Sequence, residues 1–167
     1  PYKEKTRVMA VLGSLTNEEL MEDVKAAFLF LKGTRSIPVS SIGVIGFCMG
    51  GFTAMLAACR LPLKFAISCY GGGISDERAG IGFQPFMGEF KKIKCPVFLL
   101  YGETDQSIPQ DQVELVRESL RNAQVEYELK VYLGAGHAFL REGEATYHPT
   151  AAKEAWNDIF GWLKLQK

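Results

Sequence analysis

The sequence predicts an α/β fold, with a mostly parallel sheet covered by flanking helices. Two observations support this fold class. Short apolar runs alternate along the chain with segments that carry apolar residues at helical spacing. Several of these runs are apolar on both faces, which is typical of strands in a parallel sheet. The 167 residues contain no linker and no repeat, so we expect residues 1–167 to form a single domain.

The first half of the chain contains two predicted helices on either side of one buried strand. Residues 1–15 show no clear pattern. A Thr-Asn-Glu-Glu capping box at 16–19 begins a helix that ends near Gly33. The apolar run 42–46 predicts a strand buried on both faces, and residues 51–59, apolar all round, predict a buried helix.

The second half contains three predicted strands and two predicted helices. The strands are residues 64–70, 96–101 and 125–133, and the helices are marked by Val113, Val116 and Leu120 and by residues 150–167. The last strand alternates between apolar and polar residues, so we expect one of its faces to meet water near a sheet edge. The long connection 74–94 is expected to contain one short helix or turn.

Composition and charge exclude several classes of function. Lys plus Arg and Asp plus Glu both number 19, so the net charge of zero argues against a nucleic-acid partner. The longest strongly apolar stretch is far shorter than the roughly 18 residues of a membrane span. Four cysteines without Cys-x-x-Cys spacing predict reduced thiols rather than a zinc site or a disulfide scaffold. We therefore expect a cytoplasmic protein with no metal, no cofactor and no membrane partner.

The predicted strand-to-helix turn at residues 46–51 carries the candidate nucleophile. Its sequence Gly-Phe-Cys-Met-Gly-Gly fits the Gly-x-nucleophile-x-Gly elbow. Cys48 would lie at a helix N-terminus, where the dipole favours a thiolate, and the N–H of Met49 would point at a developing oxyanion. Side chains at positions 46 and 50 are expected to collide with neighbouring backbone. The alternative is a tight turn with a buried, inert cysteine.

Two further candidates follow two other predicted strands. Asp105 could accept a hydrogen bond from a histidine Nδ1–H, and Glu103 is a rival carboxylate nearer the strand end. His137 lies in a glycine-rich loop that suits a base, whereas His148 is expected at the surface. Ligands of open α/β sheets bind beyond the carboxyl ends of strands, and the order nucleophile, acid, histidine is that of α/β-hydrolases.

These motifs resemble those of the dienelactone hydrolase (carboxymethylenebutenolidase) family of the α/β-hydrolase superfamily. The matching segments are 46–51, Tyr70-Gly71, Gly102-x-x-Asp105-x-x-Ile108-Pro109 and Gly136-His137-x-Phe139-x-Arg141. The resemblance runs from about residue 16 onward, and cysteine in the elbow is its discriminating feature. It implies a thiol hydrolase that opens an unsaturated lactone carrying a carboxylate. By the same resemblance, Cys48 attacks the carbonyl, His137 moves the proton and Asp105 orients His137.

The resemblance also implies how the substrate is held. Arg141 matches the arginine that follows the family's catalytic histidine, and an arginine fork suits a carboxylate. Arg7 aligns poorly with a second family arginine, and the alternative for it is a solvated surface charge. Tyr70 is assigned to substrate binding on the same basis. The implied partner is therefore a small-molecule ester or lactone.

One departure from the family concerns the start of the chain. Family members are longer, with several strands before the helix predicted at 17–32, and those strands carry a second oxyanion donor and a glutamate that interacts with the cysteine. We therefore expect an N-terminally truncated chain that forms the C-terminal half of the fold. A sheet left open in this way is prone to pairing, so self-association or a missing N-terminal segment would complete it.

Three other functions remain to be compared with this one. Glutamine amidotransferases also use a Gly-x-Cys-x-Gly elbow, but they pair the cysteine with His-x-Glu, and Phe139 stands where that glutamate would be. A serine esterase is excluded because position 48 is cysteine. The remaining alternative is a non-catalytic interaction or regulatory protein that keeps the fold. Fast alkylation of Cys48 at neutral pH would favour the enzyme over this alternative.

Overall fold

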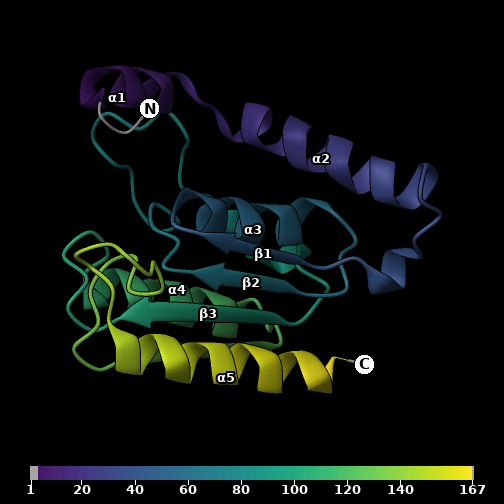
Figure 1. Ribbon diagram of the computed structural model, residues 1–167. Coiled ribbons are helices and arrows are strands. Elements are labelled where there is room, and N and C mark those ends of the chain that lie inside the picture. The colour runs from purple at the N-terminus through teal and green to yellow at the C-terminus, as the bar shows by residue number, and fades with distance from the viewer. Residues whose placement is uncertain (1–3, 167) are drawn as a thin grey trace.

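The computed structural model describes residues 4–166 and contains a four-stranded, all-parallel sheet in the order β1-β2-β3-β4 (Figure 1). The strands are β1 (Val44–Phe47), β2 (Ala66–Cys69), β3 (Val97–Gly102) and β4 (Tyr127–Tyr132). All residues of β2 and β3 are buried, as expected for apolar runs in the middle of a parallel sheet. The predicted α/β fold class is confirmed.

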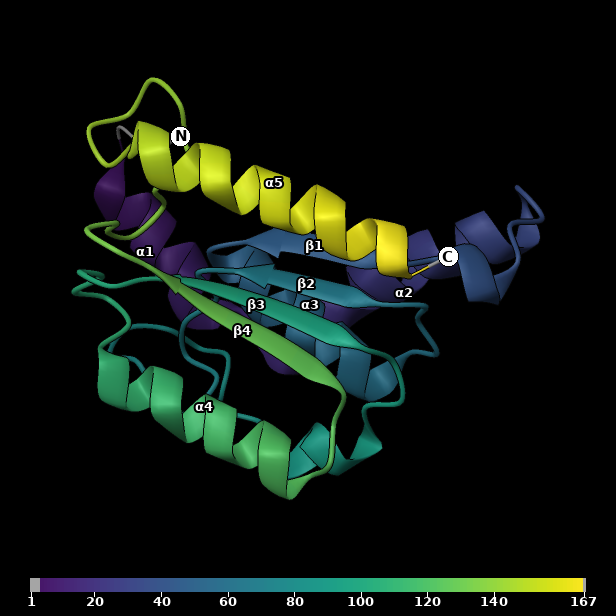
Figure 2. The ribbon, with the colours of Figure 1, turned by 90° about the horizontal axis from the view of Figure 1, so that it is seen from below.

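Helices cover both faces of the sheet. They are α1 (Lys5–Ser14), α2 (Asn17–Gly33), α3 (Met49–Arg60), α4 (Gln110–Asn122) and α5 (Pro149–Leu165), with short 3₁₀ helices η1 (Val39–Ser41) and η2 (Met87–Lys92). Figure 2 shows α5 on the opposite face of the sheet from α4, and α3 packs on β1 and β2. None of the helices in the described part of the chain has the length and apolarity that a transmembrane span requires.

The first two helices differ in how far local sequence specifies them. The capping box of α2 is present: Thr16 Oγ1 accepts from the Glu19 N–H at 3.2 Å, and the Glu19 carboxylate accepts from the Thr16 N–H at 2.8 Å. Helix α1, for which residues 1–15 gave no pattern, has no side-chain cap. It is held instead by a distant segment, because the Gly82 N–H donates to the carbonyl of Leu12 at 2.9 Å.

Strand β4 lies at one edge of the sheet, as predicted, and its polar face meets water in part, since the side chains of Glu128 and Lys130 are 42% and 41% exposed. Its first five residues are all partly buried and Tyr132 is buried. The polar side chains face α5: Lys130 Nζ donates to Asp158 at 2.8 Å, and the Tyr132 hydroxyl donates to the same carboxylate at 2.9 Å. Partial exposure to water and a polar contact with a helix together explain the alternation.

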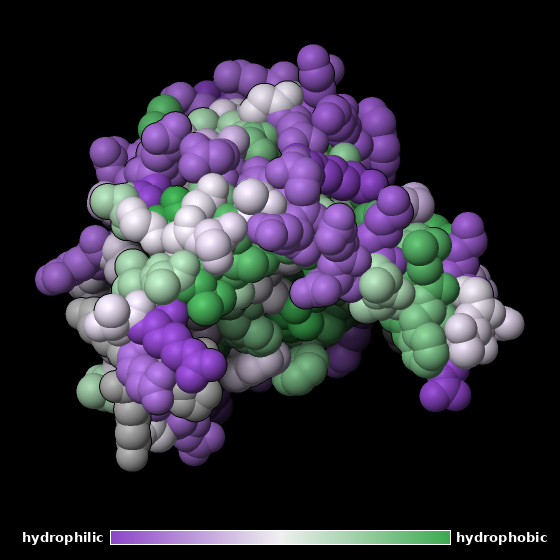
Figure 3. Space-filling view, turned by 90° about the horizontal axis from the view of Figure 1, so that it is seen from above, coloured by the Kyte–Doolittle hydropathy of each residue, from purple (hydrophilic) through white to green (hydrophobic). Residues whose placement is uncertain are grey.

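Strand β1 forms the other edge of the described sheet. The N–H groups of Val44 and Cys48 donate to the β2 side, so those of Ile45 and Phe47 face away from the sheet. The side chains of Ile45 and Phe47 are 41% and 39% exposed. From above, the molecule shows apolar surface in a hollow between hydrophilic ridges (Figure 3). The expected open edge is present in the residues that the structure describes.

Candidate active site

Cys48 occupies a strained turn between β1 and α3. Its φ of 55° and ψ of −118° lie outside the regions that non-glycine residues normally adopt. Strain of this kind costs about 1–3 kcal/mol and occurs preferentially at functional sites. The turn is close enough that a Cβ added at Gly46 would overlap the carbonyl oxygen of Gly50. The predicted need for glycine at position 46 is therefore confirmed.

The expectation for Gly50 is wrong, and Gly51 is the crowded position instead. No heavy atom lies within 4 Å of a Cβ added at Gly50, which faces a cavity. A Cβ added at Gly51 would lie 2.8 Å from the carbonyl oxygen of Cys69 and 2.9 Å from Gly71 Cα. The reason is that α3 packs directly against the end of β2 on the Gly51 side.

The structure brings Cys48, His137 and Asp105 together at the carboxyl ends of three strands. His137 Nε2 lies 3.3 Å from Cys48 Sγ, and His137 Nδ1 lies 2.8 Å from Asp105 Oδ2. Asp105 is only 4% exposed, and its Oδ1 accepts the N–H groups of Ser107 at 2.8 Å and Ile108 at 3.1 Å. These bonds hold the carboxylate so that its other oxygen faces the imidazole.

The rival carboxylate, Glu103, serves the same loop in another way. It accepts the N–H of Gly134 at 2.9 Å, at the start of the loop that carries His137. The neighbouring Thr104 N–H donates to the carbonyl of Ala135 at 2.9 Å. Residues 103 and 104 therefore fasten the histidine loop, while Asp105 contacts the imidazole itself.

The electrostatics of the pair favour a thiolate and an imidazolium. The hydrogen bond from His137 lowers the pKa of Cys48; burial opposes this, and the charge of His137 and the N–H of Met49 lower the pKa further. Burial alone would lower the pKa of His137, but its hydrogen bonds to Asp105 and Cys48 outweigh burial and raise the pKa to about 9. An exposed cysteine with a lowered pKa has the properties of a reactive thiol.

The other three cysteines, all in the described part of the chain, have the opposite character. Each is buried and unpaired. Burial raises the pKa of Cys59 and Cys69 to about 12 and that of Cys95 to about 11. These three thiols stay protonated at neutral pH, so Cys48 differs from them in its chemistry.

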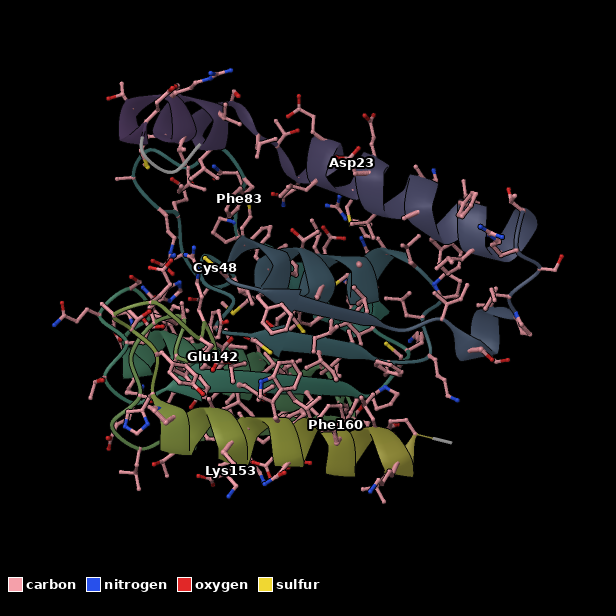
Figure 4. The ribbon with its side chains drawn as sticks, viewed as in Figure 1. Asp23, Cys48, Phe83, Glu142, Lys153 and Phe160 are labelled. Carbon is pink, nitrogen blue, oxygen red and sulfur yellow. The ribbon has the colours of Figure 1, made fainter. Side chains whose placement is uncertain are left out.

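A cavity of about 780 Å³ opens beside Cys48, between α1 and the elbow. Its lining is mainly apolar, from Val8, Val11, Leu12 and Leu15 of α1 and from Phe47 and Met49. Arg7 lies on the same wall, exposed and paired with Glu4 at 3.5 Å. Figure 4 shows Cys48 with Phe83 toward α1 on one side and Glu142 of the histidine loop on the other.

Tyr70 and Arg141 lie next to this group. Tyr70 has a φ of 42°, and its ring meets that of His137 edge-on at 5.4 Å between centroids. Burial raises the pKa of Tyr70, whereas the charge of Arg141 lowers it. Arg141 also forms an ion pair with Glu144 at 2.9 Å. Both residues therefore lie on the His137 side of the site.

His148, expected at the surface, has a structural role that the sequence interpretation missed. It is half-buried and is the N-cap of α5, where its Nδ1 accepts the N–H of Ala151 at 3.2 Å. Pro149 could have indicated this role, because proline is favoured at the first position of a helix and the residue before it is then the N-cap.

Comparison with known proteins shows which family the chain resembles. The sequence profile of the dienelactone hydrolase family matches residues 1–166. A Methylorubrum extorquens protein named "Putative carboxymethylenebutenolidase" is 31% identical over 94% of this chain and 54% of its own length. An Escherichia coli K12 protein of the same name is 36% identical over 75% of this chain and 46% of its own length.

A solved structure gives the same result in three dimensions. The crystal structure titled "Putative Dienelactone Hydrolase" from Klebsiella pneumoniae has a TM-score of 0.78 and 30% identity with this chain. It covers 89% of this chain, which in turn covers 62% of that one. The fold is therefore that of the α/β-hydrolases, and the chain spans about half the length of the curated relatives it matches.

Proposed function

Because the chain belongs to the dienelactone hydrolase family, we propose that it hydrolyses an ester or lactone through Cys48, His137 and Asp105. The observation that carries the proposal is the continuous contact from the thiol through the imidazole to the buried carboxylate, at 3.3 and 2.8 Å. The lowered pKa of the exposed Cys48 thiol supports it independently of any relative.

In the first step, Cys48 Sγ forms a bond to the substrate carbonyl carbon. The electron pair moves to the carbonyl oxygen, which the N–H of Met49 is placed to stabilise at the start of α3. When the carbonyl re-forms, the ring C–O bond breaks and protonated His137 gives its proton to the leaving alkoxide. The product is a thioester on Cys48, with the former alcohol still attached to the acyl chain if the substrate is a lactone.

In the second step, water hydrolyses the thioester. His137, now neutral, takes a proton from the water as its oxygen bonds to the carbonyl carbon, and the C–S bond then breaks to regenerate the thiolate. Asp105 keeps Nδ1 protonated throughout, so that Nε2 faces the reacting atoms. The pair returns to its starting charge state, and no net proton is consumed by the protein.

The substrate class that we propose is a lactone or ester bearing a carboxylate. Arg141, beside Tyr70 and the imidazole, supplies a positive charge on one side of Cys48. Arg7 supplies another positive charge from the cavity wall, although the carboxylate of Glu4 partly compensates its effect on a substrate. The apolar lining between them suits the carbon skeleton of such a substrate.

The activity proposed for the whole protein involves more than the described residues. The chain spans about half of its curated relatives, and β1 leaves one sheet edge open beside Cys48. We propose that self-association or a further N-terminal segment supplies the second oxyanion donor. The alternative function is that of a non-catalytic interaction protein, which this open edge would also suit.

A matched pair of cysteine variants tests the proposal. Cys48→Ala is expected to abolish hydrolysis of p-nitrophenyl acetate and of an anionic lactone, with an unchanged circular dichroism spectrum. Cys59→Ala also removes a thiol, but a buried one with a raised pKa, and should retain turnover. Turnover that survives in Cys48→Ala would refute the nucleophile assignment. A wild-type chain that neither turns over nor alkylates at neutral pH would support the non-catalytic alternative.

A further inference from the structure

Arg78 lies in the segment between β2 and η2 and reaches across to the loop that carries Asp105. Its guanidinium donates to the carbonyl oxygen of Ser107, two residues after Asp105. It also lies over Gly72, where an added Cβ would be only 2.5–2.7 Å from the guanidinium atoms. Because the Ser107 carbonyl is neutral, this hydrogen bond does not compensate the positive charge of Arg78.

The loop that Arg78 contacts already organises the rest of the site. Asp105 orients His137, and Thr104 holds the histidine loop through Ala135. A second bond joins the Arg78 segment to the same region, because Gln112 Nε2 of α4 donates to Asp76 Oδ2 at 2.8 Å. The acid loop and the start of α4 thus hold the segment after β2 on one side.

The other end of the same segment supports the wall of the cavity beside Cys48. The Gly82 N–H bonds the carbonyl of Leu12 in α1, and Asn17 forms two hydrogen bonds with the backbone of Gln84, at 2.8 and 2.9 Å. Helix α1 lines the cavity. Arg78 therefore lies on the path that connects the acid loop with this cavity wall.

We propose that Arg78 is a positioning residue of this site, which fastens the segment 71–86 to the acid loop and holds a fixed positive charge over Gly72, next to the contact between Gly71 and the elbow. The inference rests on the proposed function and adds to it a residue outside the triad. Arginine suits both tasks, since its planar fork binds a carbonyl while the charge persists at every relevant pH. In support, Arg78 is among the charges that lower the pKa of Cys48.

Other charged and titratable groups face Cys48 from the surrounding elements, and they define the background for a test. They are Glu4 just before α1 and Arg7 on it, Cys69 and Tyr70 at the end of β2, Asp105 after β3, and His137 and Arg141 after β4. Glu4 and Arg7 oppose each other as an ion pair, and the pKa values of Cys69 and Tyr70 are raised, so both stay neutral. Arg141 is paired with Glu144, so the cations that act on Cys48 are His137 and Arg78.

The test measures how fast iodoacetamide alkylates Cys48 between pH 4 and pH 10, with the modified peptide identified by mass spectrometry. In Arg78→Gln, the midpoint of the rate profile should lie above the wild-type midpoint, but by less than in His137→Asn, because the hydrogen bond of His137 is the largest cause of the lowered pKa and the charge of Arg78 is a weaker one. Arg117→Gln is the matched control, because Arg117 pairs with Glu114 on the outer side of α4. Its midpoint should equal that of the wild type.

Arg78→Lys keeps the positive charge but removes the planar guanidinium group. It is also the second variant if Arg78→Gln fails to fold. It should keep the midpoint near the wild-type value while proteolysis within 71–86 becomes faster. A midpoint in Arg78→Gln that moves no more than in Arg117→Gln would overturn the inference, as would a rise in Arg78→Lys as large as that in Arg78→Gln. Failure of the proposed function is distinguishable, because wild-type Cys48 would then itself titrate at an ordinary thiol pKa.

Discussion

At the scale of single residues, the chemistry depends on how two side chains share one proton. The 3.3 Å contact between Cys48 and His137 lowers the pKa of the thiol and raises that of the imidazole. Residue types and chain order were enough to predict which side chains would meet. The sequence could not show what the rival carboxylate does, because the bond from the Gly134 N–H to Glu103 depends on how the histidine loop folds back.

The shared proton predicts a bell-shaped pH dependence of kcat/KM for an activated ester. Activity should rise with pH as the thiol ionises through its lowered pKa, and should fall as His137 loses its proton around pH 9. The two limbs belong to the coupled pair rather than to either residue alone. Stopped-flow or plate assays from pH 4 to pH 10 would measure the profile.

A histidine variant provides the control for this profile. His137→Asn should shift the alkylation midpoint of Cys48 upward, toward the ordinary thiol pKa of 9.0, because the main cause of the lowered value is removed. A kcat/KM that keeps rising beyond pH 10 in the wild type would contradict the ion pair. So would an alkylation midpoint that stays the same in His137→Asn.

At the scale of elements, predictability depended on whether the cause was local. The capping box of α2 and the buried strands β2 and β3 were predictable, since their signals lie within the segments. Helix α1 was not, because its backbone is held by residue 82 and it lacks a side-chain cap. The polar face of β4 meets water in part, as predicted, but its contact with Asp158 was not predictable, because that residue lies about thirty residues farther along the chain.

Two glycines of the elbow differ in how closely other atoms surround them, and this difference gives a stability prediction. Gly46→Ala should destabilise the fold by more than about 3 kcal/mol, because its Cβ would overlap backbone that no rotamer change can move. Gly50→Ala, with no atom near the added Cβ and a helical position, should change the free energy of unfolding by less than about 1 kcal/mol.

Urea denaturation of the two variants beside the wild type measures this difference, and circular dichroism shows whether Gly46→Ala folds at all. A Gly46→Ala variant as stable as Gly50→Ala would contradict the close turn at Cys48. Fast alkylation of Cys48 in Gly50→Ala would show in addition that the thiol environment is intact in the tolerated variant.

At the scale of the whole molecule, the site depends on the order of parallel strands, which brings residues 48, 105 and 137 to one end of the sheet. Hydrophobic patterning predicted the strands but not how they pair. The open edge of β1 was expected from the family resemblance alone, since nothing in the short run Val44–Phe47 indicates whether a neighbour is present. Patterning reports burial, whereas pairing depends on distant segments.

Contacts between distant helices also make the stability of the molecule depend on pH. Arg60 at the end of α3 binds both carboxylate oxygens of Glu89 in η2, at 2.7 and 3.2 Å, and reaches Glu18 of α2 at 3.4 Å. Arg60, assisted by Lys92, lowers the pKa of Glu89 from 4.5 to about 2, although partial burial opposes the shift. This bond therefore contributes fully above pH 4.5 and is lost as the pH falls through 2.

Glu89→Gln should lower the free energy of unfolding at pH 7 by about 1–2 kcal/mol, as expected for a partly buried, charge-assisted pair. The difference between the variant and the wild type should shrink between pH 4.5 and pH 2, because protonated Glu89 resembles glutamine. Glu114→Gln, which breaks a more exposed pair within α4, should cost less than about 0.5 kcal/mol. Urea titrations at pH 7, 4 and 2.5 measure both variants. A Glu89→Gln cost that is equally large at pH 2.5 and pH 7 would mean that shape, rather than charge, holds η2 against α3.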